Sequence, residues 1–205
     1  YNVIHLDISS FWDFHKDDII ETIIEYICDE LKEEGPADID FSKSINSVLA
    51  QIYRKTNIPF IIIIDEWDCI IRNSGDEELV HKYLQFLHSL FKSEESKSFL
   101  ALAYITGILP IKKIKDESAL NNFTEYTMID SYPITQYYGF TEDEVKKLLL
   151  AYHLESHLPE MKEWYDGYHF GDADIYCPWD VINHVELLCK DSKAEPKCYW
   201  INSSG

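Results

Sequence analysis

One pair of adjacent acidic residues stands where carboxylates could do metal and phosphate chemistry. Asp65 and Glu66 directly follow Phe60–Ile64, an unbroken apolar run. A continuous β-branched run predicts a strand covered on both faces of a parallel sheet, and ligands bind at the carboxyl ends of such strands. An aspartate there can hold the water shell of Mg²⁺ beside phosphates, and an adjacent carboxylate can accept a proton from an attacking water. The pair therefore indicates a phosphoryl-transfer site.

Two further polar residues could belong to this site, whose acidic pair matches the Walker B pattern of apolar residues followed by Asp-Glu. Thr106 ends a second apolar stretch, Ser98–Ile105, and its hydroxyl could orient the attacking water or sense a γ-phosphate. Asp68 is expected to be a structural partner for a backbone or basic group. The alternative interpretations are a strand that ends in a solvated acidic turn and a threonine that caps a strand-to-loop turn.

The phosphate-binding loop that normally accompanies such a pair does not occur in the sequence. No Gly-x-x-x-x-Gly-Lys-Ser/Thr motif is present. That loop supplies the backbone N–H cradle and the lysine that hold the phosphates. The sequence starts at Tyr1, already within a strand-like pattern and without an initiator Met. We therefore expect a fragment of a longer protein, inactive as an isolated chain.

Composition excludes several classes of protein. The 205 residues include 37 acidic and 18 basic ones, for a net charge of −19, so direct binding of nucleic acid by this chain is not expected. The five cysteines form no CxxC pair, which favours free thiols in a reducing compartment over a disulfide framework. The longest apolar run is far too short to span a bilayer. We expect a cytoplasmic protein.

The hydrophobic pattern predicts an α/β fold in residues 1–131, a parallel sheet with flanking helices. Apolar residues three and four apart, within Ile19–Leu31 and within Ile45–Ile52, predict a helix that ends near Glu34 and a second that stops before Asn57. A third helix follows Ser74 and Glu77, which would suit a capping box. Strands are predicted near Val3–Ile8, over Phe60–Ile64 and over Ser98–Ile105, with Tyr126–Ile129 as a weaker candidate. Strands that alternate with helices favour a parallel sheet.

A helical region is predicted for residues 132–205. Thr141 with Glu144 forms a capping box, and Phe140 with Val145 a hydrophobic staple, at the start of a helix that runs to about Leu154. Two more helices are predicted, over Met161–Tyr168 and Pro178–Cys189.

Six stretches together resemble one family. They are, in order, Phe60–Asp68 (FIIIIDEWD), Tyr104–Leu109 (YITGIL), Leu120–Phe123 (LNNF), Tyr138–Val145 (YGFTEDEV), Trp164–Gly171 (WYDGYHFG) and Tyr176–Trp179 (YCPW). The combination resembles the bacterial AAA-ATPase-like proteins of the P-loop NTPase superfamily, over essentially the whole chain. Trp67 stands where the family usually has Tyr, and Cys177 where it usually has Asn.

The resemblance implies a P-loop NTPase-like sheet that lacks its first strand, with the Walker A loop upstream of this chain. That strand would lie between the sensor strand and the last strand of the sheet. It also implies that Asp65 is the Walker B aspartate and a ligand of the Mg²⁺ shell, Glu66 the general base and Thr106 the sensor hydroxyl. The complete protein would hydrolyse ATP with Mg²⁺, and residues 132–205 would act as a lid. Other domains of the same chain, including a C-terminal nuclease-like domain in many members, would be its partners.

Two other functions remain open from the sequence. A degenerate NTPase-like scaffold without catalysis could bind a protein partner through Trp164, Tyr165, Tyr168 and Trp179. Tryptophan and tyrosine at helical spacing are more often core residues, however. A metal-dependent nuclease centre at the acidic pair is disfavoured because no lysine has the required spacing and the net charge opposes the approach of DNA.

Overall fold

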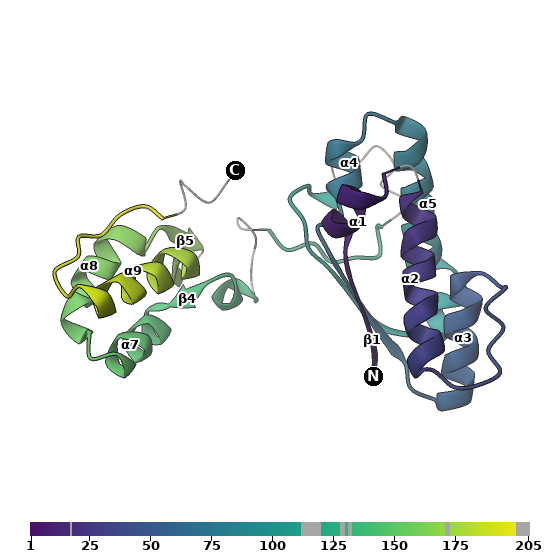
Figure 1. Cartoon of the computed structure of the whole chain (residues 1–205), viewed down its shortest axis with the longest axis horizontal. Coiled ribbons are helices and arrows are strands. Elements are labelled where there is room, and N and C mark those ends of the chain that lie inside the picture. The colour runs from purple at the N-terminus through teal and green to yellow at the C-terminus, as the bar shows by residue number, and fades with distance from the viewer. Residues whose placement is uncertain (17, 112–119, 128–129, 131–132, 171–172, 200–205) are drawn as a thin grey trace. The chain divides into compact units, whose positions relative to one another are not determined.

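The chain folds into two compact units, Tyr1–Glu125 (unit 1) and Tyr126–Gly205 (unit 2). A computed structural model describes all residues except 17, 112–119, 128–129, 131–132, 171–172 and 200–205 (Figure 1). No helix among the described residues is long and apolar enough to cross a membrane.

Unit 1 is built on a parallel sheet. Its strands are β1 (Asn2–Asp7), β2 (Phe60–Asp65) and β3 (Leu100–Ile105), in the order β1-β2-β3. Asp7 pairs with Asp65 in the first ladder, and Ile64 with Ile105 in the second, so all three carboxyl ends lie along one edge. The α/β class predicted from the sequence is confirmed at this level. The predicted strand from Ser98 begins later, because Ser96–Phe99 forms a turn of helix.

Six helices connect the strands of unit 1 within the described residues. They are α1 (Ile8–Phe14), α2 (Ile19–Glu34), α3 (Ile45–Thr56), α4 (Cys69–Asn73), α5 (Glu77–Lys92) and α6 (Ser96–Phe99). Figure 1 shows the long helices α2, α3 and α5 gathered on one side of the sheet. The predicted capping box of α5 is wrong, because Asp76 is the N-cap and accepts hydrogen bonds from the backbone N–H groups of Glu78 and Leu79.

The two faces of the sheet differ in burial. One face carries the core side chains of the strands, which are Ile4, Leu6, Phe60, Ile62 and Ile64, all packed with the helices. On the other face Leu102 is 55% exposed and Tyr104 52% exposed, and Ile61 and Ile63 of β2 are only half-buried. The prediction that β2 is covered on both faces is therefore wrong for the described residues. Both crossovers step in the same direction along the sheet, and right-handed crossovers of that kind place their helices on one face.

Unit 2 combines helices with a small antiparallel sheet. Its helices are α7 (Glu142–Ala151), α8 (Leu158–Tyr165) and α9 (Pro178–Lys190), with short 3₁₀ turns η2 (Thr135–Tyr137) and η3 (Glu155–His157). Its strands β4 (Phe140–Thr141), β5 (Tyr168–Phe170) and β6 (Ala173–Tyr176) lie in the order β4-β6-β5. The predicted capping box of Thr141 and Glu144 is confirmed at the start of α7.

The antiparallel sheet corrects the prediction of a purely helical region. Helix α8 ends at Tyr165, so Tyr168 lies in β5 and not in the predicted helix. The weak strand candidate near Tyr126 is also wrong where it is described, since Tyr126 and Thr127 belong to no strand. Met128 and Ile129 lie outside the described residues.

Candidate functional site

The carboxyl ends of β2 and β3 are joined by backbone and side-chain hydrogen bonds. The N–H of Thr106 donates to the Ile64 carbonyl at 2.9 Å, and the N–H of Trp67 donates to the Thr106 carbonyl at 3.0 Å. The Thr106 hydroxyl donates to Oδ1 of Asp65. The structure therefore brings together Asp65 and Thr106, two of the residues that the sequence singled out, although they are 41 positions apart.

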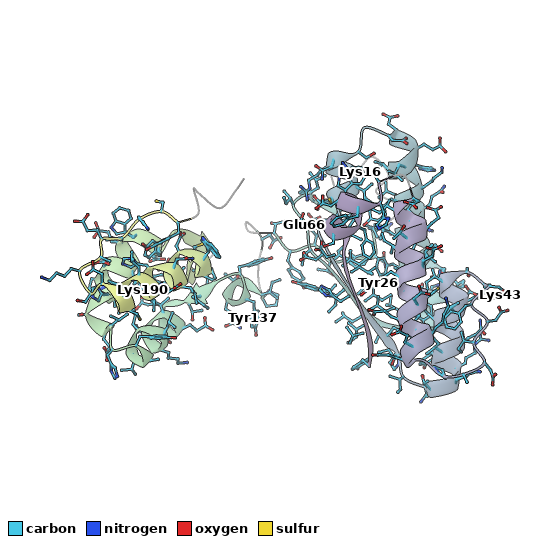
Figure 2. The ribbon with its side chains drawn as sticks, viewed as in Figure 1. Lys16, Tyr26, Lys43, Glu66, Tyr137 and Lys190 are labelled. Atoms are coloured by element: carbon cyan, nitrogen blue, oxygen red, sulfur yellow. The ribbon has the colours of Figure 1, made fainter. Side chains whose placement is uncertain are left out.

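Glu66 leaves the strand with an unusual backbone. Its φ is 51°, in the left-handed region that non-glycine residues seldom adopt. Its N–H donates to Oδ1 of Asp65 at 3.0 Å, and its carboxylate forms an ion pair with Arg72 through Oε2. The Glu66 side chain stays partly exposed at the end of the sheet where β1 runs into α1 (Figure 2). The carboxylates of the two adjacent acids therefore have different partners, Arg72 for Glu66 and Thr106 for Asp65.

Asp68 is the buried anchor of the same loop. Its side chain is 0% exposed and accepts hydrogen bonds from the backbone N–H groups of Ile108, at 3.2 Å, and Leu109, at 2.8 Å. A third bond comes from Nε of Arg72 at 2.7 Å. Asp68 therefore bonds to backbone groups and to a basic residue, as its predicted structural role requires. The acid connects the loop after β2 to the loop after β3.

Arg72 carries the positive charge that balances Glu66 and Asp68. Partial burial acts to lower the pKa of its guanidinium, but attraction to Asp68 and then Glu66 outweighs this and raises the pKa. No role for Arg72 was predicted from the sequence. The available signal was its i+4 position relative to Asp68, which places the two side chains on the same side of α4.

Comparison with known proteins identifies the family of this chain. A family model described as "Predicted AAA-ATPase" matches residues 1–115, which span β1 to β3 and both loops of the candidate site. The chain belongs to the AAA-ATPase-like family. The family inferred from the sequence motifs is thereby confirmed, over residues 1–115.

One curated relative of this AAA-ATPase-like chain is also informative about length. It comes from Azotobacter chroococcum mcd 1 and is described as "Uncharacterized protein in vnfD 5'region". The two are 24% identical over 145 residues, which make up 70% of this chain and 27% of the relative. The chain therefore spans only about a quarter of the length of the relative it matches.

The oxygen atoms of this AAA-ATPase-like site fit the ligand chemistry of Mg²⁺. Asp65 is exposed at the end of β2, and its carboxylate accepts a hydrogen bond from the Thr106 hydroxyl. Magnesium is usually held by one or two carboxylates, with waters and substrate phosphates as the remaining ligands. Within the described part of the chain, no cluster of three or more His, Cys, Asp or Glu residues could hold a metal by itself. Asp65 and Thr106 are therefore the residues of this sheet edge that could offer oxygen ligands to such an ion.

A third acidic residue at this sheet edge has a local structural role. Asp7 ends β1 beside Asp65, and its carboxylate accepts hydrogen bonds from the N–H and hydroxyl of Ser9 and from the hydroxyl of Ser10. The hydrogen bond from the Ser9 side chain is the main reason that the pKa of Asp7 is lowered. Asp7 therefore caps α1 and is already satisfied by the local chain.

Trp67 and Gly107 pack tightly between the two loops. Trp67 is buried, and its carbonyl accepts a hydrogen bond from the hydroxyl of Tyr83 at 2.8 Å. Burial raises the pKa of Tyr83, so the phenol remains a donor. A Cβ atom at Gly107 would overlap both Oδ1 of Asp68 and the Trp67 ring. The loop after β3 can therefore approach the acidic loop this closely only with glycine at position 107.

Gly107→Ala is expected to lower the free energy of unfolding by about 1–3 kcal/mol, because the added methyl group forces these buried neighbours apart. Urea denaturation followed by circular dichroism measures the change. Gly75→Ala is the matched control, since a Cβ there meets nothing within 4 Å. Equal stability of the two variants would contradict the close packing of the loops.

The aromatic residues of the alternative binding hypothesis do not form one exposed group. Trp164 is 48% exposed and Trp179 49% exposed. Tyr165 is buried, and its hydroxyl donates to the carbonyl of Lys197 and accepts from the N–H of Lys197, both at 3.1 Å. The side chain of Tyr168 lies outside the described structure. Tyr165 is thus a core residue of unit 2 and not a recognition residue.

Proposed function

We propose that Asp65, Glu66 and Thr106 form the metal-binding and water-activating half of an ATP-hydrolysing site in the complete protein. The observation that carries the proposal is the hydrogen bond from Thr106 to Asp65, which links the ends of two parallel strands beside Glu66. Membership of the AAA-ATPase-like family supports the same chemistry. The phosphate-binding loop comes from sequence outside this chain.

Each residue has a distinct role in this proposal. Mg²⁺, when bound with ATP, supplies the positive charge that neutralises the phosphates. Asp65 holds the water shell of that ion through its carboxylate, with its orientation set by Thr106. Glu66 accepts a proton from the attacking water. Thr106 is placed to respond to a γ-phosphate, because a hydrogen bond to phosphate would compete with its bond to Asp65.

The sheet order supports a P-loop NTPase-like fold for the complete protein. The described strands pair as β1-β2-β3, so β3 has a free edge within the described residues. The superfamily places its phosphate-loop strand beside the sensor strand, which is β3 in this assignment. The missing strand would pair at that edge and satisfy its backbone groups. Unit 2 would act as the lid, with further domains of the chain as partners. The cysteines are free thiols, which supports a reducing, cytoplasmic location.

Asp65→Asn in the full-length protein tests the metal role. Asparagine keeps an acceptor for Thr106 but loses the charge that attracts Mg²⁺. We expect the Mg²⁺ concentration for half-maximal ATP hydrolysis to rise about tenfold or more. Asp40→Asn is the control, because the Asp40 carboxylate contacts Ser42 and Lys43 in the loop between α2 and α3. An unchanged Mg²⁺ requirement for Asp65→Asn would contradict the assignment.

A binding module without catalysis is the second candidate. One observation favours it: Trp164 and Trp179 are half-exposed. The two candidate functions differ in whether the full-length protein binds and hydrolyses Mg·ATP. A full-length protein that neither binds nor hydrolyses Mg·ATP would support the binding module and contradict the ATPase.

A further inference from the structure

The guanidinium of Arg72 bridges two acids that have different roles in the site. Its Nε donates to Oδ2 of Asp68, and its Nη2 to Oε2 of Glu66. The two bonds come from two different nitrogens of one rigid planar group. Holding Nε on Asp68 therefore restricts where Nη2 meets Glu66.

Asp68 cannot move without breaking other contacts. Its carboxylate is fully buried and is also held by the backbone N–H groups of Ile108 and Leu109. Those residues directly follow Thr106 and Gly107 in the loop after β3. Through Asp68, the guanidinium is therefore held relative to the loops after both β2 and β3.

The contact with Glu66 involves only one carboxylate oxygen. Within the described part of the chain, Oε2 of Glu66 meets Arg72, no hydrogen bond involves Oε1, and the side chain is 38% exposed. The Glu66 backbone is left-handed, and within the described residues the ion pair with Arg72 is the contact that restrains its carboxylate. An oriented carboxylate with one free oxygen is the arrangement that a general base needs to meet a water.

We propose that Arg72 is a positioning residue, which holds the Glu66 carboxylate in the orientation that receives the proton of the attacking water. This inference rests on the proposed function. Arg72 acts only through Glu66, and it links that orientation to the loop after β3 through Asp68.

Lysine at position 72 separates this role from a structural one. A lysine ammonium keeps the positive charge beside buried Asp68, but it is a single point and lacks the planar fork that reaches both acids at once. The Arg72→Lys protein should therefore fold, with Glu66 released from its fixed orientation. Arg54→Lys is the matched control, because Arg54 on α3 bonds through Nε to the carbonyl of Ala50 in the same helix.

The test is the steady-state kinetics of Mg·ATP hydrolysis by the full-length protein. Wild type is compared with Arg72→Lys, Glu66→Gln, the double variant and Arg54→Lys. We expect Arg72→Lys to lower kcat about tenfold to a hundredfold and to change KM less than about twofold. In the Glu66→Gln background the same change should have no further effect, because Arg72 acts only through Glu66.

The outcomes separate this inference from the function on which it rests. If wild type is active and Glu66→Gln is not, but Arg72→Lys matches wild type, positioning by Arg72 is wrong while the ATPase assignment stands. A rise in kcat for Arg72→Lys, or effects that multiply in the double variant, also overturns it. If wild type itself does not hydrolyse ATP, the proposed function fails and this inference fails with it.

Discussion

Replacing Asp68 with alanine is expected to lower the free energy of unfolding by about 3–5 kcal/mol, a cost typical of breaking a buried ion pair from one side. The side chain is fully buried and accepts three hydrogen bonds, from Arg72 and from the backbone of Ile108 and Leu109. Without it, two backbone N–H groups lose their acceptor and the guanidinium keeps only its contact with Glu66.

Chemical denaturation of this chain, followed by circular dichroism, measures the effect. Asp29→Ala is the control, because Asp29 is 70% exposed and, among the described residues, pairs with Lys32 on the surface of α2. Exposed pairs of that kind contribute about 0–1 kcal/mol. Asp68→Asn should also be destabilised, because the asparagine NH₂ cannot accept the N–H bonds. A loss below about 1 kcal/mol for Asp68→Ala would show that the network does not form.

The hydrogen bonds of Asp68 were only partly predictable from the sequence. A buried polar partner for Asp68 could be predicted from an acid within an apolar segment, and the α4 spacing made Arg72 available to it. Its other partners, Ile108 and Leu109, are 40 and 41 residues away. Only the pairing of β2 with β3 brings them together, and no local pattern encodes that distance. The proximity of Thr106 to Asp65 was easier to predict, because both directly end strands whose carboxyl ends share one edge of a parallel sheet. The contacts of Asp68 depend in addition on the path of the two loops beyond the strands.

The fold was predictable where segments are long and periodic. The apolar faces of α2 and α3 repeat over many turns, so their limits were close to those observed. The strands of unit 2 are two to four residues long, too short for any alternation to be recognised. The continuous run Phe60–Ile64 shows that all these side chains are apolar, but it does not show whether both faces of the strand are buried. Whether Ile61 and Ile63 are buried depends on which elements pack on their face, and both crossovers of unit 1 lie on the other one.

Glu66→Gln in the full-length protein is expected to lower kcat for ATP hydrolysis about a hundredfold to a thousandfold, with little change in KM, because glutamine cannot accept the proton of the attacking water. The glutamine carbonyl still accepts the hydrogen bond from Arg72, so the loop should keep its structure. An unchanged unfolding midpoint for the variant checks this point directly.

Glu78→Gln provides the matched control for this result. Glu78 is an exposed residue of α5 whose carboxylate pairs with Lys82, and its replacement should leave kcat unchanged. If Glu66→Gln hydrolyses ATP within about threefold of wild type, less than the effect of even a modest general base, Glu66 is not the base. The ion pair with Arg72 would then be the whole role of Glu66, and the acidic turn after β2 would serve the packing of two loops and not the activation of water.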